Sequence, residues 1–315
     1  MSPHLFPSRR QNIVNSMKRL LTALLLALPV LADWRQHYDL GDAMLTQGKF
    51  AEAQRELVAA LQEAEAAHQQ GPRLGVILDA LGRAEMQAGR YRPALNYFER
   101  SLGIWAPQSE AMARALCNAA RAYQSIGERS RAEDSVRRAL EILPQSPQIW
   151  LVLGQVLYLK QDYVGAETAS GKALSIWEES KSPEAATALN DLAVLYQARR
   201  KNQKAAEALE RAVAIMAAGQ ARARVLTNLG VLSWKLGRRS EGTAHLSRAL
   251  NEMETAVGPH HPDTGKVLNE YSAVLRKTGR RIEANEMEKR AHAIQSAFAS
   301  QTNSGRGSVD WHDLK

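Results

Sequence analysis

Cysteine is almost absent from this sequence, since Cys117 is the only one among 315 residues. A single cysteine cannot form an internal disulfide, so packing has to hold the fold together. A lone cysteine usually behaves as a small apolar side chain, whereas a reactive thiol needs an exposed, electropositive setting. We expect Cys117 to be buried and structural.

Aromatic residues are also scarce, at 6% of the chain, although hydrophobic residues make up an ordinary 45%. This hydrophobic content excludes global disorder. Few aromatics together with abundant alanine indicate helices that approach each other closely.

Motifs of known catalytic chemistry are lacking. The sequence has no H-E-x-x-H pair, G-x-S-x-G elbow or phosphate-binding glycine loop. His260 and His261 are adjacent, but no third ligand follows at a suitable spacing, so we interpret them as turn residues and not as a metal site. Glutamates such as Glu52 and Glu56 are expected on solvated helix faces. We therefore predict no enzymatic activity, no cofactor and no metal.

Acidic residues are missing from the first 32 positions, which hold four basic ones. The formal net charge of the chain is +8, and without this segment 37 basic residues face 33 acidic ones. No run of Lys and Arg is interleaved with aromatics, so the sequence does not favour nucleic-acid binding.

This basic segment resembles a secretory signal. Met17-Lys18-Arg19 precedes the apolar run Leu20–Leu31, and Val30 and Ala32 fit the small positions before a cleavage site. We predict a signal peptide over residues 1–32, cleaved near Ala32. Residues 1–16 are then an over-long start if Met17 is the true initiator. The mature chain is predicted to have no membrane span.

Two alternatives exist for this segment. The first is an uncleaved anchor, although the run is shorter than the roughly 20 residues that a span needs. The second is a twin-arginine signal at Ser8-Arg9-Arg10, although the residues that follow fit poorly.

One helix pair recurs along the rest of the chain. It is most regular over residues 145–178, where Trp150, Leu153 and Leu157 lie at helical spacing and Tyr163 opens a second amphipathic segment. A pair this small cannot bury its own apolar faces, so it requires similar neighbours.

Three landmarks define seven copies. The first is a small residue in the middle of each first helix: Gly41, Gly82, Ala120, Gly154, Ala193, Gly230 and Ser272. The second is a turn seven residues later: Gly48, Gly89, Gly127, Gln161, Arg200, Gly237 and Gly279. The third is a small residue five positions after the turn: Ala53, Ala94, Ala132, Ala166, Ala205, Gly242 and Ala284. Larger side chains at the first and third landmarks would force the two helices apart.

The domain organisation follows from these landmarks. We predict one repeat domain over residues 33–299 and a flexible tail over residues 300–315, with Trp311 and Leu314 as either a docking motif or part of a disordered end. The second helix of the first repeat is expected to continue beyond a minimal length until Gly71-Pro72 stops it.

Several motifs resemble the tetratricopeptide repeat signature. They are Trp150-x2-Leu153-Gly154, Ala94-x3-Phe98 and Pro144. The last two repeats, which are joined by Gly258-Pro259-His260-His261-Pro262, resemble the longer variant found in kinesin light chains. Some residues depart from the family pattern: Leu157 stands where Tyr is common, Gln161 and Arg200 replace the usual turn glycine, and Gly242 replaces alanine. Repeats 4, 5 and 6 are therefore expected to be less regular.

The resemblance implies an all-α fold, a right-handed α-solenoid superhelix of about seven helix-turn-helix repeats. In such arrays the first helices line a concave groove that mostly binds extended peptides or other proteins. Carrying the groove positions over to this chain selects Arg83, Arg114, Asn118, Arg121, Leu151, Tyr158, Asn190, Arg224, Asn228, Lys266 and Asn269.

These residue types suggest the ligand. Asparagine can pair with any peptide backbone, and arginine favours carboxylates. We predict an extended, somewhat acidic polypeptide, with Leu151 and Tyr158 as an apolar floor in repeat 4; the alternative is that the polar residues are ordinary solvated helix surface. The Lys–Asn pair of chaperone-tail clamps is absent, so a chaperone C-terminus is not the expected ligand.

The leading functional prediction is a non-enzymatic protein–protein interaction scaffold that is exported to the periplasm or secreted. Two alternatives stay open. One is a structural envelope assembly factor that acts by self-association, and the other is a cytosolic peptide-sensing regulator if the N-terminal segment is retained. No oligomeric state is predicted.

Overall fold

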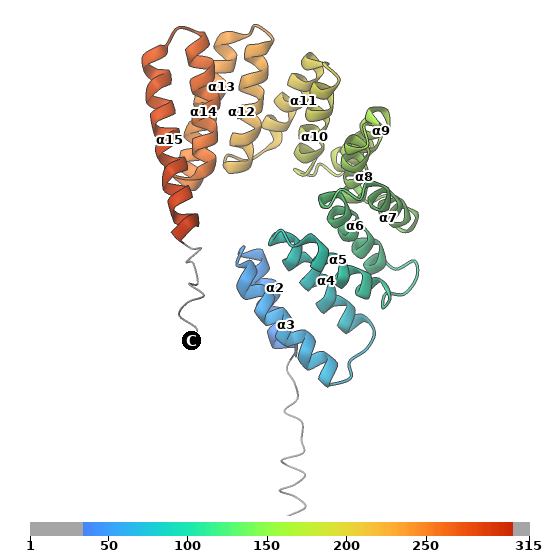
Figure 1. The fold of residues 1–315 in the computed structure, drawn as a ribbon. Helices are drawn as coiled ribbons and strands as arrows, with labels where there is room; N and C mark the ends of the chain where they lie inside the picture. Colours follow the sequence, from blue (N-terminus) through green and yellow to red (C-terminus); the bar gives the residue numbers. More distant parts are fainter. Residues whose placement is uncertain (1–33, 305–315) are drawn as a thin grey trace, which may run out of the picture. The chain divides into compact units, whose positions relative to one another are not determined.

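The computed structural model describes residues 34–304, and within this range fourteen α-helices form seven hairpins without any strand (Figure 1). The chain divides into two compact halves, one ending at Ile142 and the other beginning at Leu143. The predicted all-α helical repeat is confirmed. The predicted signal peptide and residues 305–315 of the predicted tail lie outside the described residues.

The N-terminal half holds repeats 1 to 3. Its helices are α2 (Trp34–Thr46), α3 (Phe50–Ala66), α4 (Pro72–Gln87), α5 (Tyr91–Leu102), α6 (Glu110–Ser125) and α7 (Arg129–Ile142). Each first helix packs on the second helix of its own repeat, and α4 and α6 also pack on the second helix of the repeat before them. Phe98 is fully buried against Gly82, where any side chain would overlap its ring, so the first landmark has to be small.

The C-terminal half holds repeats 4 to 7. Its helices are α8 (Pro147–Leu159), α9 (Tyr163–Glu179), α10 (Ala185–Ala198), α11 (Asn202–Ile215), α12 (Gln220–Lys235), α13 (Arg239–Val257), α14 (Pro262–Lys277) and α15 (Arg281–Ser304). Leu226, Leu246, Met253, Leu268 and Leu275 belong to a hydrophobic cluster that connects the last two repeats. Helix α15 continues to Ser304, five residues beyond the predicted end of the domain.

Two other boundaries differ from expectation. Helix α3 ends at Ala66, before Gly71-Pro72, because His68 adopts a left-handed backbone with φ 52°. Gln161 (φ 65°) and Arg200 (φ 57°) adopt the same left-handed turn as the glycines of the other repeats, whose φ values are 74° to 84°. The expectation that repeats 4 and 5 are less regular is therefore wrong at their turns.

The charged residue after several turns connects neighbouring repeats. Arg90 donates to Gln54 Oε1 at 2.7 Å, and Arg238 donates to Gln203 Oε1 at 3.0 Å. Lys201 lies 3.7 Å from Glu167. In each case the partner belongs to the second helix of the preceding repeat, so these contacts help to fix the rotation between repeats.

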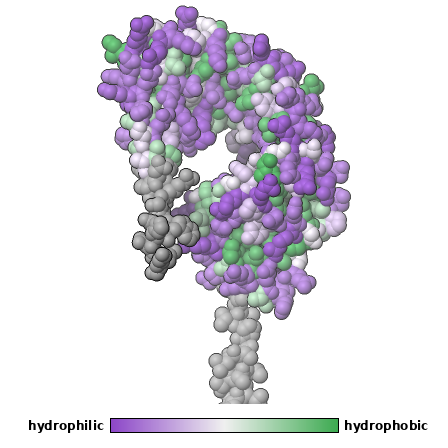
Figure 2. All heavy atoms as spheres, viewed as in Figure 1, coloured by the Kyte–Doolittle hydropathy of each residue, from purple (hydrophilic) through white to green (hydrophobic). Residues whose placement is uncertain are grey.

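Residues singled out for possible chemistry have structural roles. Cys117 is buried, and this burial raises the pKa of its thiol, as expected of a small core residue. His261 is the N-cap of α14, where its Nδ1 accepts from the backbone N–H of Asp263 at 3.1 Å. Within residues 34–304, no helix has the length and apolar character needed to cross a membrane. Figure 2 shows a mostly hydrophilic visible surface on each half.

Candidate functional site

A concavity of about 430 Å³ lies in the N-terminal half. It is lined by Leu45, Thr46, Gly48, Phe50, Arg83, Met86, Gln87, Asn118 and Arg121. Helices α4 and α6 supply every polar lining residue except Thr46, and the end of α2 and the start of α3 supply most of the remainder. Three predicted groove residues, Arg83, Asn118 and Arg121, therefore come together at one site.

The two arginines of this concavity differ in their pairing. Arg83 donates to Asp42 Oδ1 in α2 at 2.8 Å, and both side chains are about two-fifths exposed (43% and 39%). Within residues 34–304, the guanidinium of Arg121 has no hydrogen-bonding or ionic partner, and neither does the amide of Asn118. Two polar groups at this site are thus available to a ligand, and a third is held by an internal carboxylate.

Arg114 lies in α6 but outside the residues that line the concavity. It pairs with Glu110 one turn earlier at 2.9 Å and is 67% exposed. It is close enough to Asp79 in α4 to oppose the effect of burial on the pKa of that carboxyl. Arg114 therefore contributes positive charge near the concavity without lining it.

Asp79 and Tyr38 are half-buried ionisable residues that sequence reasoning missed. Burial raises the pKa of Asp79, against the effect of hydrogen bonds from Ser101 and Trp105. Burial also raises the pKa of Tyr38, and the nearby charge of Asp42 acts in the same direction. Both groups lie near Arg83, so the wall beside the concavity contains acidic as well as basic residues.

The predicted basic residues of the C-terminal half also converge. Arg224 in α12 lies 3.7 Å from Asp263, and Lys266 in α14 lies 2.7 Å from the same carboxylate. Asn228 and Asn269 are exposed on these two helices. The hydrogen bond from Lys266 holds the pKa of Asp263 below its ordinary value.

The other predicted residues of this half do not form a comparable cluster. Leu151 is only 4% exposed and belongs to the core, so it cannot serve as the predicted apolar floor. Tyr158 is half-buried, with its ring centroid 5.9 Å from that of Tyr163. Asn190 is half-buried in α10.

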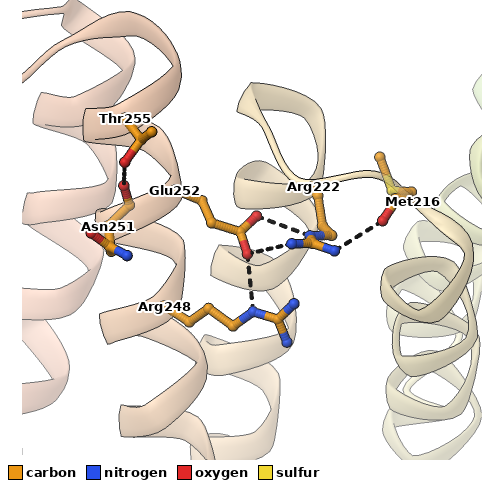
Figure 3. Close-up of polar contacts among 6 residues, drawn as sticks. All are labelled: Met216, Arg222, Arg248, Asn251, Glu252 and Thr255. Carbon is orange, nitrogen blue, oxygen red and sulfur yellow. Dashed lines mark hydrogen bonds and ion pairs between the residues drawn. The ribbon is translucent and has the colours of Figure 1, made fainter.

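A partly buried ion-pair cluster, also missed by sequence reasoning, fixes the start of α12 (Figure 3). Arg222 donates to both oxygens of Glu252 in α13, at 2.9 and 2.8 Å, and to the carbonyl of Met216 at 3.0 Å. Arg248 donates to Glu252 at 2.9 Å. This cluster attaches the α11–α12 connection to α13 and so positions the helix that carries Arg224 and Asn228.

Comparisons with known proteins agree with this architecture. Tetratricopeptide repeat family models match residues 36–106, 113–146, 146–218 and 221–297. The chain therefore belongs to the tetratricopeptide repeat family. The longer repeat expected in the C-terminal repeats is consistent with these matches. No curated protein matches the chain significantly in sequence.

Solved structures of low sequence identity share the fold. The apo form of RapI aligns with a TM-score of 0.65 at 15% identity, over 83% of this chain and 76% of RapI. The structure of the APC/C hetero-tetramer Cut9-Hcn1 gives 0.60 at 15% identity, and the match spans 83% of this chain but only 46% of the other. A tetratricopeptide repeat protein from Parabacteroides merdae gives 0.57 at 18% identity, over 83% and 93% of the two chains. Stacked helical hairpins of this family form protein-interaction scaffolds, and this chain is built as one.

Proposed function

We propose that the protein is an exported scaffold that binds an extended, acidic polypeptide segment in the concavity of its N-terminal half. One observation carries the proposal. Arg83, Asn118 and Arg121 come from two different repeats and meet at one site, where Arg121 and Asn118 have no partner within residues 34–304.

The chemistry of the lining fits such a ligand. The planar guanidinium of Arg121 matches a carboxylate in two parallel hydrogen bonds. The amide of Asn118 can both donate to and accept from a peptide group, whatever the side chains. Leu45, Phe50 and Met86 supply apolar contact at the same concavity. All of these groups stand on or beside packed helices, so little conformational entropy is lost when a ligand binds.

Fluorescence anisotropy with the whole chain tests this binding. The probe is a labelled flexible peptide rich in Glu and Leu, and the comparison peptide has every Glu replaced by Gln. We expect the Glu peptide to bind more tightly, and the double variant Arg121→Ala, Asn118→Ala to weaken it by about tenfold.

Arg129→Ala provides the matched control, because Arg129 is an exposed arginine in α7 outside the lining. It should leave binding unchanged. Equal affinities for the Glu and Gln peptides would contradict the proposal. The same loss of affinity in Arg129→Ala as in the double variant would also contradict it. Circular dichroism of each variant checks that helicity is retained.

Export is the second part of the proposal, and it rests on the basic and apolar segment from Met17 to Ala32. Sequencing the N-terminus of the protein recovered from the cell envelope or the medium should give Asp33 as the first residue. Recovery only from the cytosol, with Met1 or Met17 as the first residue, would show that the segment is retained.

A further inference from the structure

We infer that the C-terminal half carries a second recognition surface, which fits an extended polypeptide with two acidic groups about 16 Å apart. This α12–α14 surface consists of Arg224, Asn228, Val231, Lys235, Lys266, Asn269, Ala273 and Lys277. It shares no residue with the concavity of the N-terminal half, and its chemistry stands independently of that site.

Helices α12 and α14 lie side by side and run in the same direction. At their starts, Gln220 in α12 donates to Asp263 in α14 at 2.8 Å. At their ends, Lys277 Nζ in α14 lies 4.6 Å from the ring centroid of Trp234 in α12. Contacts at both ends are possible only if the two helices are in matching register.

Each helix presents two basic residues on the same face. Arg224 and Lys235 are eleven positions apart in α12, and so are Lys266 and Lys277 in α14. Eleven residues make about three helical turns and a rise of about 16 Å. In matching register, the surface therefore has one basic pair at its start and another basic pair at its end.

The solvent exposure of these residues shows that the face is not part of the core. Arg224 is 62% exposed and Lys266 is 76% exposed. Every other member of the surface is exposed except Val231, which is half-buried. Asparagine, valine and alanine occupy most of the middle, where Glu270 of α14 is the one acidic residue between the two basic ends.

The two ends differ in how far they are neutralised. Asp263 lies between Arg224 and Lys266 and partly compensates the first pair. Within residues 34–304, neither Lys235 nor Lys277 has an acidic partner. Glu270 is exposed in the middle of α14, so the surface with its neighbouring carboxylates still carries a net charge of about two positive.

The spacing favours a polypeptide over a nucleic acid. A nucleic-acid strand places a phosphate every 3.4 Å or so, whereas the basic pairs stand about 16 Å apart with Glu270 between them. Base stacking requires an open aromatic face, and the ammonium of Lys277 lies over the ring of Trp234. In an extended chain, about five residues span 16 Å, which matches acidic groups four to six positions apart.

Peptides with a variable acidic spacing test this inference. Each probe carries two Glu-Glu pairs whose Gly/Ser/Asn spacer is absent, about three residues long or about ten residues long, and the middle length places the acidic groups about four to six positions apart. They are titrated into the whole chain carrying Arg121→Ala and Asn118→Ala, so that the contribution of the N-terminal site is reduced. We expect the middle spacing to bind most tightly, and Lys235→Ala with Lys277→Ala to weaken it at least about fivefold and remove the preference.

Two further variants make the test specific. Lys235→Arg with Lys277→Arg retains both charges and should retain the spacing preference. Lys172→Ala with Lys289→Ala removes two exposed lysines from the second helices α9 and α15 and should have no effect. The inference is overturned if affinity is independent of spacing, if the Lys172/Lys289 variant loses as much affinity, or if an oligothymidylate binds more tightly than the middle-spaced peptide.

Discussion

The carboxylate of Asp79 in α4 accepts a hydrogen bond from Trp105 Nε1 at 3.1 Å and so fastens the α5–α6 connection to the first helix of repeat 2. It also accepts from Ser101 Oγ at 2.5 Å. The Trp105 ring covers Gly75 so closely that a Cβ there would lie 2.7 Å from it. Burial nevertheless raises the pKa of Asp79, so loss of water outweighs the two hydrogen bonds and the nearby arginines.

Removing this acceptor should destabilise the N-terminal half. Asp79→Leu leaves the Trp105 indole without its partner, and the expected loss is about 1–2 kcal/mol in the free energy of unfolding. Asp79→Asn keeps an acceptor and removes the desolvated charge, so its stability at pH 7 should be close to that of the wild type. Urea unfolding followed by circular dichroism measures both variants.

The pH dependence gives an independent check on Asp79. Its pKa in the folded state is above the ordinary value of 3.8, so the folded state binds the proton more tightly than the unfolded state. As the pH falls from 7 through this raised pKa, the wild type should gain stability relative to Asp79→Asn. A constant or opposite difference between the two proteins at pH 7 and pH 4 would contradict this assignment.

Glu252 should respond to pH in the opposite direction. The hydrogen bonds from Arg222 lower the pKa of Glu252, so its stabilising contribution is present above the ordinary value of 4.5 and is lost as the pH falls below it. Arg222 is 17% exposed and Glu252 is 10% exposed. Arg222→Ala removes the bidentate pair and the bond to the Met216 carbonyl, and we expect a loss of about 2–3 kcal/mol at pH 7.

Arg248→Ala is the matched comparison for this prediction. Arg248 contacts the same carboxylate but is 49% exposed, so its loss should cost less than about 1 kcal/mol. Chemical denaturation at pH 7 and pH 4 should show the Arg222→Ala penalty shrinking on acidification. An equal penalty for both arginines would mean that the cluster is no stronger than a surface ion pair.

The repeat itself was predictable because it depends on local pattern. Gly82 must be small whatever its partner, and the turn residues recur at a fixed distance. Asp79 and Arg222 were not predictable, because their partners Trp105 and Glu252 lie 26 and 30 positions away and nothing in the repeat pattern specifies them. Leu151 was misassigned because helical spacing shows only that it lies on an apolar face of α8. It does not show that neighbouring helices bury that face. The convergence of Arg83, Asn118 and Arg121 was predictable from register, whereas the pairing of Arg83 with Asp42 was not.

The landmark glycine Gly230 and the non-landmark glycine Gly171 are both helical but differ in the space around them. A Cβ at Gly230 would lie 2.7 Å from Leu246 Cγ and 2.9 Å from the carbonyl oxygen of Gly242, whereas a Cβ at Gly171 would meet nothing within 4 Å. Gly230→Ala should therefore cost about 1–3 kcal/mol by overpacking. Gly171→Ala should stabilise by up to about 1 kcal/mol, because alanine is the better helix former. Thermal unfolding should give a lower melting temperature for Gly230→Ala and a higher one for Gly171→Ala. Similar changes in both variants would show that close helix approach does not explain the glycine at position 230.

Replacing the turn residues of repeats 4 and 5 with glycine should stabilise the protein. Gln161 and Arg200 are exposed and hold φ values of 65° and 57°, a region that costs a side-chain-bearing residue about 1 kcal/mol or more. Gln161→Gly and Arg200→Gly are expected to raise stability by about 0.5–1 kcal/mol each, after the extra entropy of glycine in the unfolded chain is subtracted. Gly89→Ala at the equivalent turn should lower it by a similar amount, and melting temperatures that move the other way would argue against strain at these turns.

Asp42 competes with any ligand carboxylate for Arg83, since the two side chains already pair at 2.8 Å beside the proposed binding concavity. Asp42→Asn removes this competitor and one negative charge near the site. We expect the acidic peptide to bind about two- to fivefold more tightly, a gain typical of one exposed ion pair.

Asp39→Asn removes a charge from an exposed position of the same helix that makes no ion pair with Arg83, so it should have a smaller effect. The gain should disappear at high salt, because exposed pairs are screened. If Asp42→Asn weakens the peptide instead, the Asp42–Arg83 pair orients Arg83 for the ligand and does not compete with it.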